Sequence, residues 1–155
     1  MPIQKLREFL DANKVKYVTI RHSTAFTAQE TAASAHIPGK ELAKTVVLRI
    51  DGRMTIAVLP ASHKLDLPLL KEAVAAHDVE IAREADFKDL FPGCDTGAMP
   101  PFGNLYGMDV LVDALLAENT EIAFNACSHS ELVKLKYDDY VKLAKPKIAS
   151  FSVLR

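Results

Sequence analysis

The stretch KTVVLRIDGRMTIAVLP, residues 44–60, decides the fold of this chain. Two runs that are rich in valine, isoleucine and threonine flank Asp51-Gly52-Arg53. Such runs favour strands, and a central Asp-Gly pair is a strong signal for a tight hairpin turn. The stretch therefore predicts two antiparallel strands, over 44–50 and 54–60.

Helices and further strands surround this hairpin. Apolar residues at helical spacing predict an amphipathic helix over 3–14. Thr27 with Glu30 is a capping-box pattern, which opens a helix over 28–36 that Pro38-Gly39 ends. The same reasoning predicts helices over 66–76 and 84–91 and a last helix capped by Asp138, with further strands over 15–22, 79–82, 108–113, 121–127 and 131–137. Hairpins and helical crossovers together indicate an α+β fold, in which residues 1–155 form one domain around a mixed sheet.

Composition narrows the classes of function. The 155 residues are 49% hydrophobic and 25% charged, which suits one globular domain with its own core. A formal net charge of −1 gives no general attraction to nucleic acid or to an anionic membrane. No apolar run reaches the roughly 18 residues of a membrane span, and the charged N-terminal stretch is not a signal peptide. We therefore expect a cytoplasmic protein that contacts neither membrane nor DNA.

The two cysteines, Cys94 and Cys127, are too few to build a disulfide framework. We expect both to stay reduced in a cytosol. The sequence has no cluster of soft ligands with zinc spacing, and its histidines show no H-x-x-x-H pattern. We therefore expect no metal and no cofactor.

The stretch GAMPPFGNLYG, residues 97–107, is the most unusual loop of the chain. Glycine tolerates backbone angles that are closed to other residues, and proline fixes φ, so Gly97 followed by Pro100-Pro101 predicts a sharp and rigid turn. A turn of this kind can aim successive N–H groups at one oxyanion or carbonyl oxygen. The structural alternative is a corner of the chain that packs Phe102 into the core.

Lys44 opens the first strand of the hairpin and is the single charged residue from Ala43 to Leu48. A half-buried lysine beside apolar neighbours suits catalysis or anion binding. The alternative is an ordinary solvated lysine.

His129 lies in FNACSHSE, just after the predicted strand over 121–127, with Asn125 nearby. Cys127 and His129 fall on one face of an extended chain and could form a nucleophile–base pair, whereas Ser128 and His129 would point to opposite faces. The alternative is a histidine in a turn. Towards the C-terminus, basic residues form a group that is the best candidate for contacts with phosphates: Lys134, Lys136, Lys142, Lys145 and Lys147.

Together and in this order, four segments resemble the YbaK / prolyl-tRNA synthetase editing-domain family. They are HSTAFTAQETAASA, LAKTVVLRIDGRMTIAVLPASHKLDLPLL, GAMPPFG and FNACSHSELVKL, and the resemblance runs from about residue 15 to residue 143. It implies a central, partly barrel-like sheet flanked by helices. It also implies a free-standing hydrolase that removes wrongly attached amino acids from tRNA, without a metal.

The resemblance assigns roles to particular residues. The essential lysine of the family matches Lys44, which would bind the ester carbonyl or the terminal phosphate. The glycine–proline loop matches Gly97 to Pro101, whose N–H groups at Gly97 and Ala98 would stabilise the oxyanion. The residues expected to surround the amino acid are Thr45, Pro100, Pro101, Phe102, Gly103, Asn125 and His129, and those expected to contact tRNA are Lys134, Lys136, Lys142 and Lys145.

Substrate specificity stays open at this level. The histidine of alanine-directed members matches His129. The first candidate for the substrate is therefore alanine attached to the tRNA for proline, and serine, threonine and cysteine follow. Some of those members have asparagine directly after the lysine, where this chain has Thr45. The expected partner is mischarged tRNA, and the second candidate is an aminoacyl-tRNA synthetase. The alternatives are a non-catalytic tRNA- or nucleotide-binding module, a synthetase-associated regulator, and a thiol-dependent hydrolase that uses Cys127 and His129.

Overall fold

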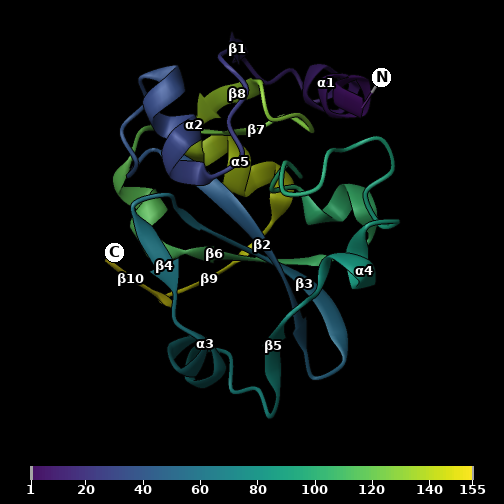
Figure 1. Cartoon of the computed structure of the whole chain (residues 1–155), viewed down its shortest axis with the longest axis vertical. Coiled ribbons are helices and arrows are strands. Elements are labelled where there is room, and N and C mark those ends of the chain that lie inside the picture. Colours follow the sequence, from purple (N-terminus) through teal and green to yellow (C-terminus); the bar gives the residue numbers. More distant parts are fainter. Residues whose placement is uncertain (1, 155) are drawn as a thin grey trace.

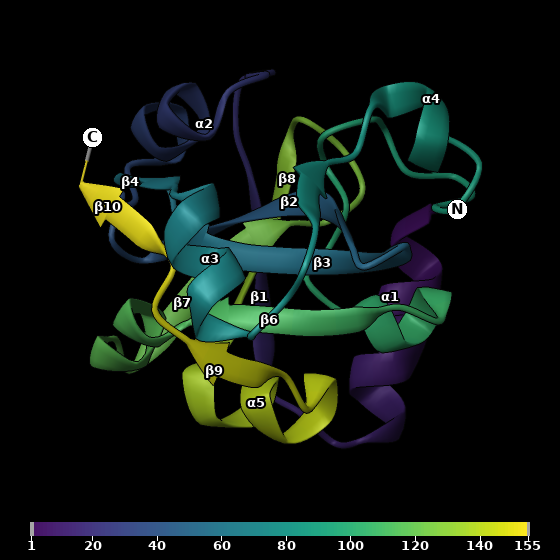
Figure 2. The same ribbon diagram turned by 90° about the horizontal axis from the view of Figure 1, so that it is seen from below.

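The computed structural model describes residues 2–154, which form a mixed sheet with helices on both of its faces (Figures 1 and 2). The helices are α1 (Pro2–Ala12), α2 (Ala28–Ala35), α3 (Leu67–Ala73), α4 (Glu84–Phe87) and α5 (Tyr137–Ala144), with 3₁₀ turns η1 (Gly103–Tyr106) and η2 (Ala114–Glu118). The strands are β1 (Tyr17–Arg21), β2 (Leu42–Ile50), β3 (Arg53–Pro60), β4 (His63–Leu65), β5 (Val79–Ile81), β6 (Asp109–Asp113), β7 (Glu121–Asn125), β8 (Glu131–Lys136), β9 (Lys147–Ala149) and β10 (Ser152–Leu154).

The hairpin predicted from 44–60 lies at the centre of the sheet. The strand order is β1-β8-β7-β2-β3-β6-β9, with β5 beside β2, while β4 and β10 pair separately. Strands β2 and β3 are antiparallel, and Asp51 and Gly52 turn between them with φ of 47° and 83°. Parallel pairs join β2 to β7, β3 to β6 and β6 to β9, which confirms the mixed sheet.

The two faces of the sheet bury different sets of side chains, because successive residues of a strand point to opposite sides. On β2, Val47 belongs to the largest core cluster, with side chains of α1 and α5. Its neighbour Leu48 packs with Leu70 of α3, and Leu42 packs with Ala32 of α2. Figure 2 shows α2 and α5 on opposite sides of the strands.

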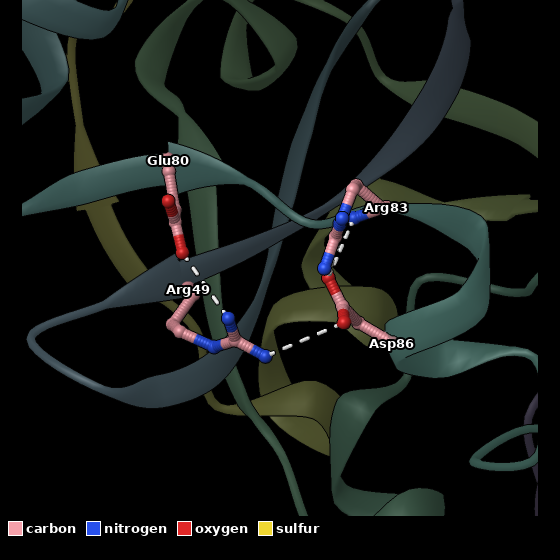
Figure 3. A network of polar contacts seen from close by, with 4 residues as sticks. All are labelled: Arg49, Glu80, Arg83 and Asp86. Carbon is pink, nitrogen blue, oxygen red and sulfur yellow. Dashed lines mark hydrogen bonds and ion pairs between the residues drawn. The ribbon is translucent and has the colours of Figure 1, made fainter.

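A network of ion pairs near the surface links β5 and α4 to the C-terminal end of β2 (Figure 3). Arg49 of β2 lies 3.1 Å from Glu80 of β5 and 3.8 Å from Asp86 of α4. The Arg83 N–H donates to the Asp86 carboxylate at 3.0 Å, and this hydrogen bond is the main reason why the pKa of Asp86 lies below its usual value. The network holds a short helix whose own residues are all at least partly exposed.

The long elements agree with the sequence analysis, and the differences lie in short ones. The capping box at α2 is confirmed, since Thr27 accepts from the Glu30 N–H and Glu30 accepts from the Thr27 N–H. The prediction that Asp138 caps the last helix was wrong, because the N-cap is Lys136 and Asp138 lies in the first turn. The helix predicted over 84–91 ends already at Phe87. Elements of three to five residues were not predicted: β4, β9, β10, η1 and η2.

Within residues 2–154, no helix is long and apolar enough to cross a membrane.

Candidate active site

The sheet opens where β2 and β7 part. These parallel strands pair through Leu42–Ala123 and Ala43–Phe124. Beyond that point β2 continues beside β3, and β7 continues beside β8 as far as Asn125. Lys44 and Asn125 directly follow the last pair, so the topology brings together two residues that are far apart in the sequence.

Lys44 is half-buried at this opening. Alternation along β2 places it on the same face as Leu42, which is the face that α2 covers. Its ammonium group donates to the carbonyl oxygen of His63, the first residue of β4, at 2.6 Å. The side chain therefore has a fixed position, with its charge held at the edge of the opening.

A cavity of about 220 Å³ lies between Lys44 and the start of α2, where Thr27, Ala28 and Gln29 line it. The Thr27 hydroxyl accepts from the Glu30 N–H at 3.0 Å, which fixes the first turn of the helix. The N–H groups of Ala28 and Gln29 are among those that an α-helix leaves without an acceptor of its own, and they carry the positive end of the helix dipole. The cavity is thus lined by a lysine and by the first residues of a helix, two kinds of group that bind anionic or carbonyl oxygens.

Asn125 offers a hydrogen-bond acceptor at the same opening. Its Oδ1 atom is buried and has no hydrogen-bond partner among the described residues. Buried polar atoms in native proteins nearly always have a partner, and an orphaned one calls for an explanation. An ammonium or hydroxyl group of a bound ligand would supply the missing donor.

Thr45 lies on the other face of the sheet. Its neighbours on that face of β2, Ala43 and Val47, both belong to the largest core cluster. Its predicted contact with the amino acid therefore needs a ligand that reaches through the opening rather than into the cavity beside Lys44.

The segment over 94–98 is bound to the connection between β7 and β8. A disulfide joins Cys94 and Cys127, whose Cα atoms lie 4.2 Å apart. The Asp95 N–H donates to the Cys127 carbonyl, and the Cys127 N–H donates to the Ala98 carbonyl, both at 2.9 Å. The expectation that both cysteines stay reduced was wrong for this structure, because the turn and the strand end bring the two sulfur atoms together. Cys127 is also 2% exposed, which argues against a thiol nucleophile.

Gly97 has φ of +87°, the left-handed conformation that the sequence led us to expect. Its N–H donates to the Met99 sulfur at 3.2 Å, and the Ala98 N–H donates to the Asp95 carbonyl at 3.0 Å. Both N–H groups that the resemblance assigned to the oxyanion are therefore occupied, and Ala98 is fully buried. Their role at the oxyanion stays a prediction, and the first turn of α2, which lines the cavity, is an alternative source of N–H donors.

The remainder of the loop is a structural corner. Phe102 is fully buried, and its ring lies 5.7 Å from Phe9, 5.5 Å from Phe124 and 5.3 Å from Tyr140. The Tyr140 hydroxyl donates to the Pro101 carbonyl at 2.9 Å, and burial raises the pKa of this phenol, which keeps it protonated. Pro100, Pro101, Phe102 and Gly103 are all buried, and their contacts with an amino acid stay predictions.

His129 lies against the exposed part of the same loop. Its Nε2 atom is 2.8 Å from the Thr96 carbonyl oxygen, and its Cε1 atom would lie 3.5 Å from a Cβ at Gly97. Its ring centre is 4.9 Å from that of Phe26. The imidazole is thus held by the loop and by an aromatic neighbour, and Cys127 is bonded to Cys94 rather than available to it.

The lysines near the C-terminus are not among the residues that line the cavity. Lys134 is 3.9 Å from Glu121, and Lys136 is at the opposite end of β8 from the connection that carries His129. Lys142 and Lys145 belong to α5 and its C-cap, on the side of the sheet away from α2 (Figure 2). Exposed basic side chains nearer the opening are Lys64, which follows His63, and Arg21, whose strand partner Glu131 lies two residues from His129.

Three features of the site were missed from the sequence: the start of α2 as a wall of the cavity, the His63 carbonyl as the partner of Lys44, and the exposed ring of Phe26. The capping box located the start of the helix, and its orphaned N–H groups were a usable signal. The contact of Lys44 with His63 depends on where β4 lies, and the exposure of Phe26 depends on how the segment between β1 and α2 packs. The sequence pattern contains neither.

Comparisons with known proteins agree with this architecture. A family model described as aminoacyl-tRNA editing domain matches residues 22–143. The multifunctional Ser/Thr-tRNA deacylase ProXp-y of Escherichia coli (strain K12) is 33% identical over 114 residues, which are 70% of this chain and 68% of that protein. A proline–tRNA ligase of Bacillus mycoides (strain KBAB4) is 21% identical over 127 residues, 82% of this chain and 22% of the ligase. The crystal structure of hypothetical protein APE2540 has a TM-score of 0.84 at 21% identity and covers 96% of this chain and 99% of its own.

Proposed function

The chain belongs to the aminoacyl-tRNA editing domain family, and from this premise we propose that it is a deacylase that acts in trans on mischarged tRNA. In this reaction water adds to the carbonyl carbon of the ester between an amino acid and the terminal ribose. The ribose hydroxyl leaves, and the products are the free amino acid and uncharged tRNA. The observation that carries the proposal is the cavity of about 220 Å³ that Lys44 shares with the first turn of α2.

Groups that line this cavity, together with Asn125 at the neighbouring opening, are suited to the two things that ester hydrolysis needs most. A developing oxyanion is stabilised by donors that are already in place, and we assign this role to the Lys44 ammonium group with the N–H groups of Ala28 and Gln29. The substrate must also be oriented. Asn125 Oδ1, a buried acceptor without a protein partner, is suited to bind the α-ammonium group of the amino acid.

The lining of the cavity favours an amino acid with a small polar side chain. A hydrophobic pocket separates small side chains by little energy, whereas a site that hydrogen-bonds a hydroxyl group rejects the analogue without it strongly. The lining contains Thr27, Gln29 and Lys44, all polar, and the relative from Escherichia coli is named a Ser/Thr-tRNA deacylase. We therefore place serine and threonine esters ahead of alanine esters. The prediction of alanine rested on His129, and the Nε2 atom of this imidazole is already hydrogen-bonded to the Thr96 carbonyl.

The proposed reaction needs no metal. Among residues 2–154, no group of three or more His, Cys, Asp or Glu side chains is placed to hold an ion. Activity should therefore survive incubation with EDTA followed by dialysis, measured as the rate of deacylation before and after treatment. Loss of activity on chelation, with recovery on adding Zn²⁺, would contradict this part of the proposal.

A panel of mischarged tRNAs tests the function directly. The purified chain is incubated with seryl-, threonyl-, alanyl- and cysteinyl-tRNA, and with correctly charged prolyl-tRNA as the control, with and without a prolyl-tRNA synthetase. Release of serine or threonine well above the spontaneous rate, without the synthetase, is the expected result. Binding of these tRNAs with no release of any amino acid would identify a non-catalytic binding module instead.

A further inference from the structure

Phe26 stands beside the proposed site and is 72% exposed. Large hydrophobic side chains that are exposed within residues 4–154 are Val18, Phe26, Leu69, Ile81, Leu90, Ile148 and Leu154, and Phe26 alone among them is aromatic. The next residue, Thr27, lines the cavity that contains Lys44. An isolated exposed apolar side chain needs no explanation, but the position and support of this one do.

The backbone on either side of Phe26 is fixed. The His22 N–H donates to the Ser130 carbonyl at 2.9 Å, and the Ala25 N–H donates to the His129 carbonyl at 3.0 Å. Ala25 is buried, and Thr27 is held by its capping box. The ring of Phe26 therefore projects from a rigid segment.

The ring of His129 supports that of Phe26. Their centres are 4.9 Å apart, and the planes are tilted by 52°. His129 is itself held by the Thr96 carbonyl and rests against Gly97. Two aromatic rings from separate loops thus form a preorganised pair next to the opening of the cavity.

We propose that Phe26 and His129 form a stacking platform for the terminal adenine base of the tRNA acceptor end. This inference rests on the proposed function, because only the ribose separates that base from the ester. Aromatic side chains stack on nucleobases whatever the sequence, and unpaired single-stranded ends are the parts of an RNA that present their bases for stacking. A base placed on Phe26 directs the ester towards Thr27 and the cavity. The platform recognises the end that all tRNAs share, so it contributes affinity and position rather than choice of amino acid.

Kinetics with the preferred ester separate this role from a purely structural one. Phe26→Ala should raise KM about tenfold, because losing one base–aromatic stack weakens binding by roughly that factor or more. The kcat value should change less than KM, and Phe26→Trp should restore KM. Ile81→Ala, which removes a 55% exposed side chain from β5, is the matched control and should behave as wild type.

A binding measurement tests the platform without any turnover. The chain contains no tryptophan, so Phe26→Trp introduces a single indole whose fluorescence reports on stacking. Titration with 3′-serylamido-3′-deoxyadenosine, which cannot be hydrolysed as an ester, should change this fluorescence saturably. The same titration should leave an Ile81→Trp control unchanged, and an analogue with ribose but no base should bind far more weakly to the Phe26→Trp variant.

The possible results keep the two proposals apart. A saturable signal without hydrolysis of any ester would support the platform and overturn the proposed catalysis. Hydrolysis by wild type with an unchanged KM in Phe26→Ala would overturn the platform and leave the catalysis standing. A KM that rises in Phe26→Ala solely when a synthetase is present would show that the ring contacts protein, and would also overturn the platform.

Discussion

At the scale of the residue, Lys44 is held in a fixed position beside the cavity. The carbonyl of His63 holds its ammonium group at 2.6 Å beside the start of α2. Lys44→Ala should lower kcat/KM for the preferred ester by about 100-fold or more, the usual effect of removing one preorganised donor from an oxyanion site. The melting temperature should fall modestly, since a hydrogen bond from a charged group contributes about 1.5–3 kcal/mol.

Lys142→Ala is the control for this prediction, because Lys142 is exposed on α5, on the side of the sheet away from α2. It should retain wild-type kinetics. Turnover close to wild type in Lys44→Ala would remove Lys44 from the catalytic site. A variant that fails to melt cooperatively would instead identify a structural link between β2 and β4.

Gly97 provides a second prediction at this scale. A side chain at φ of +87° strains the backbone by about 1–2 kcal/mol, while the new Cβ would meet His129 at an ordinary contact distance of 3.5 Å. Gly97→Ala should therefore lower stability modestly and lower kcat/KM more than that strain explains, by shifting the loop and His129. Thermal melts and kinetics with several esters measure the two effects.

Gly52→Ala is the matched control for Gly97→Ala. Gly52 has φ of +83° in the β2–β3 turn, and a Cβ there meets nothing within 4 Å. It should show the same loss of stability with unchanged kinetics. Equal kinetic effects in both variants, or none in either, would leave the 97–103 loop with a structural role alone.

The sequence predicted individual site residues unevenly. Lys44 stood out because a charge interrupts an apolar strand, and the structure places it at a cavity. Phe102 looked like a wall of the pocket, yet three aromatic rings enclose it. A pattern of glycine and proline predicts a rigid turn, but which side of the turn faces solvent depends on packing between distant segments.

At the scale of the element, the segment over 94–98 is fixed to the end of β7 by a disulfide and two backbone hydrogen bonds. Cys127→Ala should keep its deacylase activity, because a disulfide-bonded and buried sulfur is not a nucleophile. The variant should lose about 2–4 kcal/mol of stability under non-reducing conditions, as expected for a disulfide that closes a loop of this length.

Thiol titration of the native protein checks the same element. A thiol reagent should label no cysteine before reduction and two after reduction in denaturant. Reduced wild type should melt near Cys127→Ala. Labelling of native wild type together with loss of activity would revive the thiol-dependent mechanism.

Elements with strong local signals were predicted well. The hairpin over 44–60 and α2 carry turn and capping residues that act within a few positions, and both are present. The strands β4, β9 and β10 have three residues each, and their pairing depends on partners elsewhere in the chain. Short strands of this kind have no periodicity to read, so the sequence could not reveal that β4 would hold Lys44.

At the scale of the whole molecule, the three core clusters share β2, which contributes Val47 to the first, Leu48 to the second and Leu42 to the third. We therefore propose that residues 1–155 form one domain.

A net charge of −1 and scattered lysines offer tRNA a small basic surface. Lys64, next to the His63 that holds Lys44, and Arg21, at the end of β1 beside the connection that carries His129, are better candidates for phosphate contacts than Lys142 and Lys145 on α5.

Binding of tRNA should accordingly depend weakly on salt. A plot of log K against log salt should slope at roughly −2 to −4, since few phosphates are neutralised. The double variant Arg21→Gln/Lys64→Gln should reduce the slope by about one unit per side chain removed, and Lys142→Gln/Lys145→Gln should leave it unchanged. A slope near −8, or the opposite order of the two variants, would place the RNA on the α5 side.

The short contact between β2 and β7 has a mechanical consequence. Their ladder has two residue pairs, so β1, β8 and β7 lie on one side of this junction and β2, β3, β5, β6 and β9 on the other, with the largest core cluster packed across it. A ligand bound by Lys44 on one side and Asn125 on the other spans this junction as a temporary crosslink. A bound substrate would then hold the two parts of the sheet together at the short β2–β7 ladder, and release of the amino acid would remove this link.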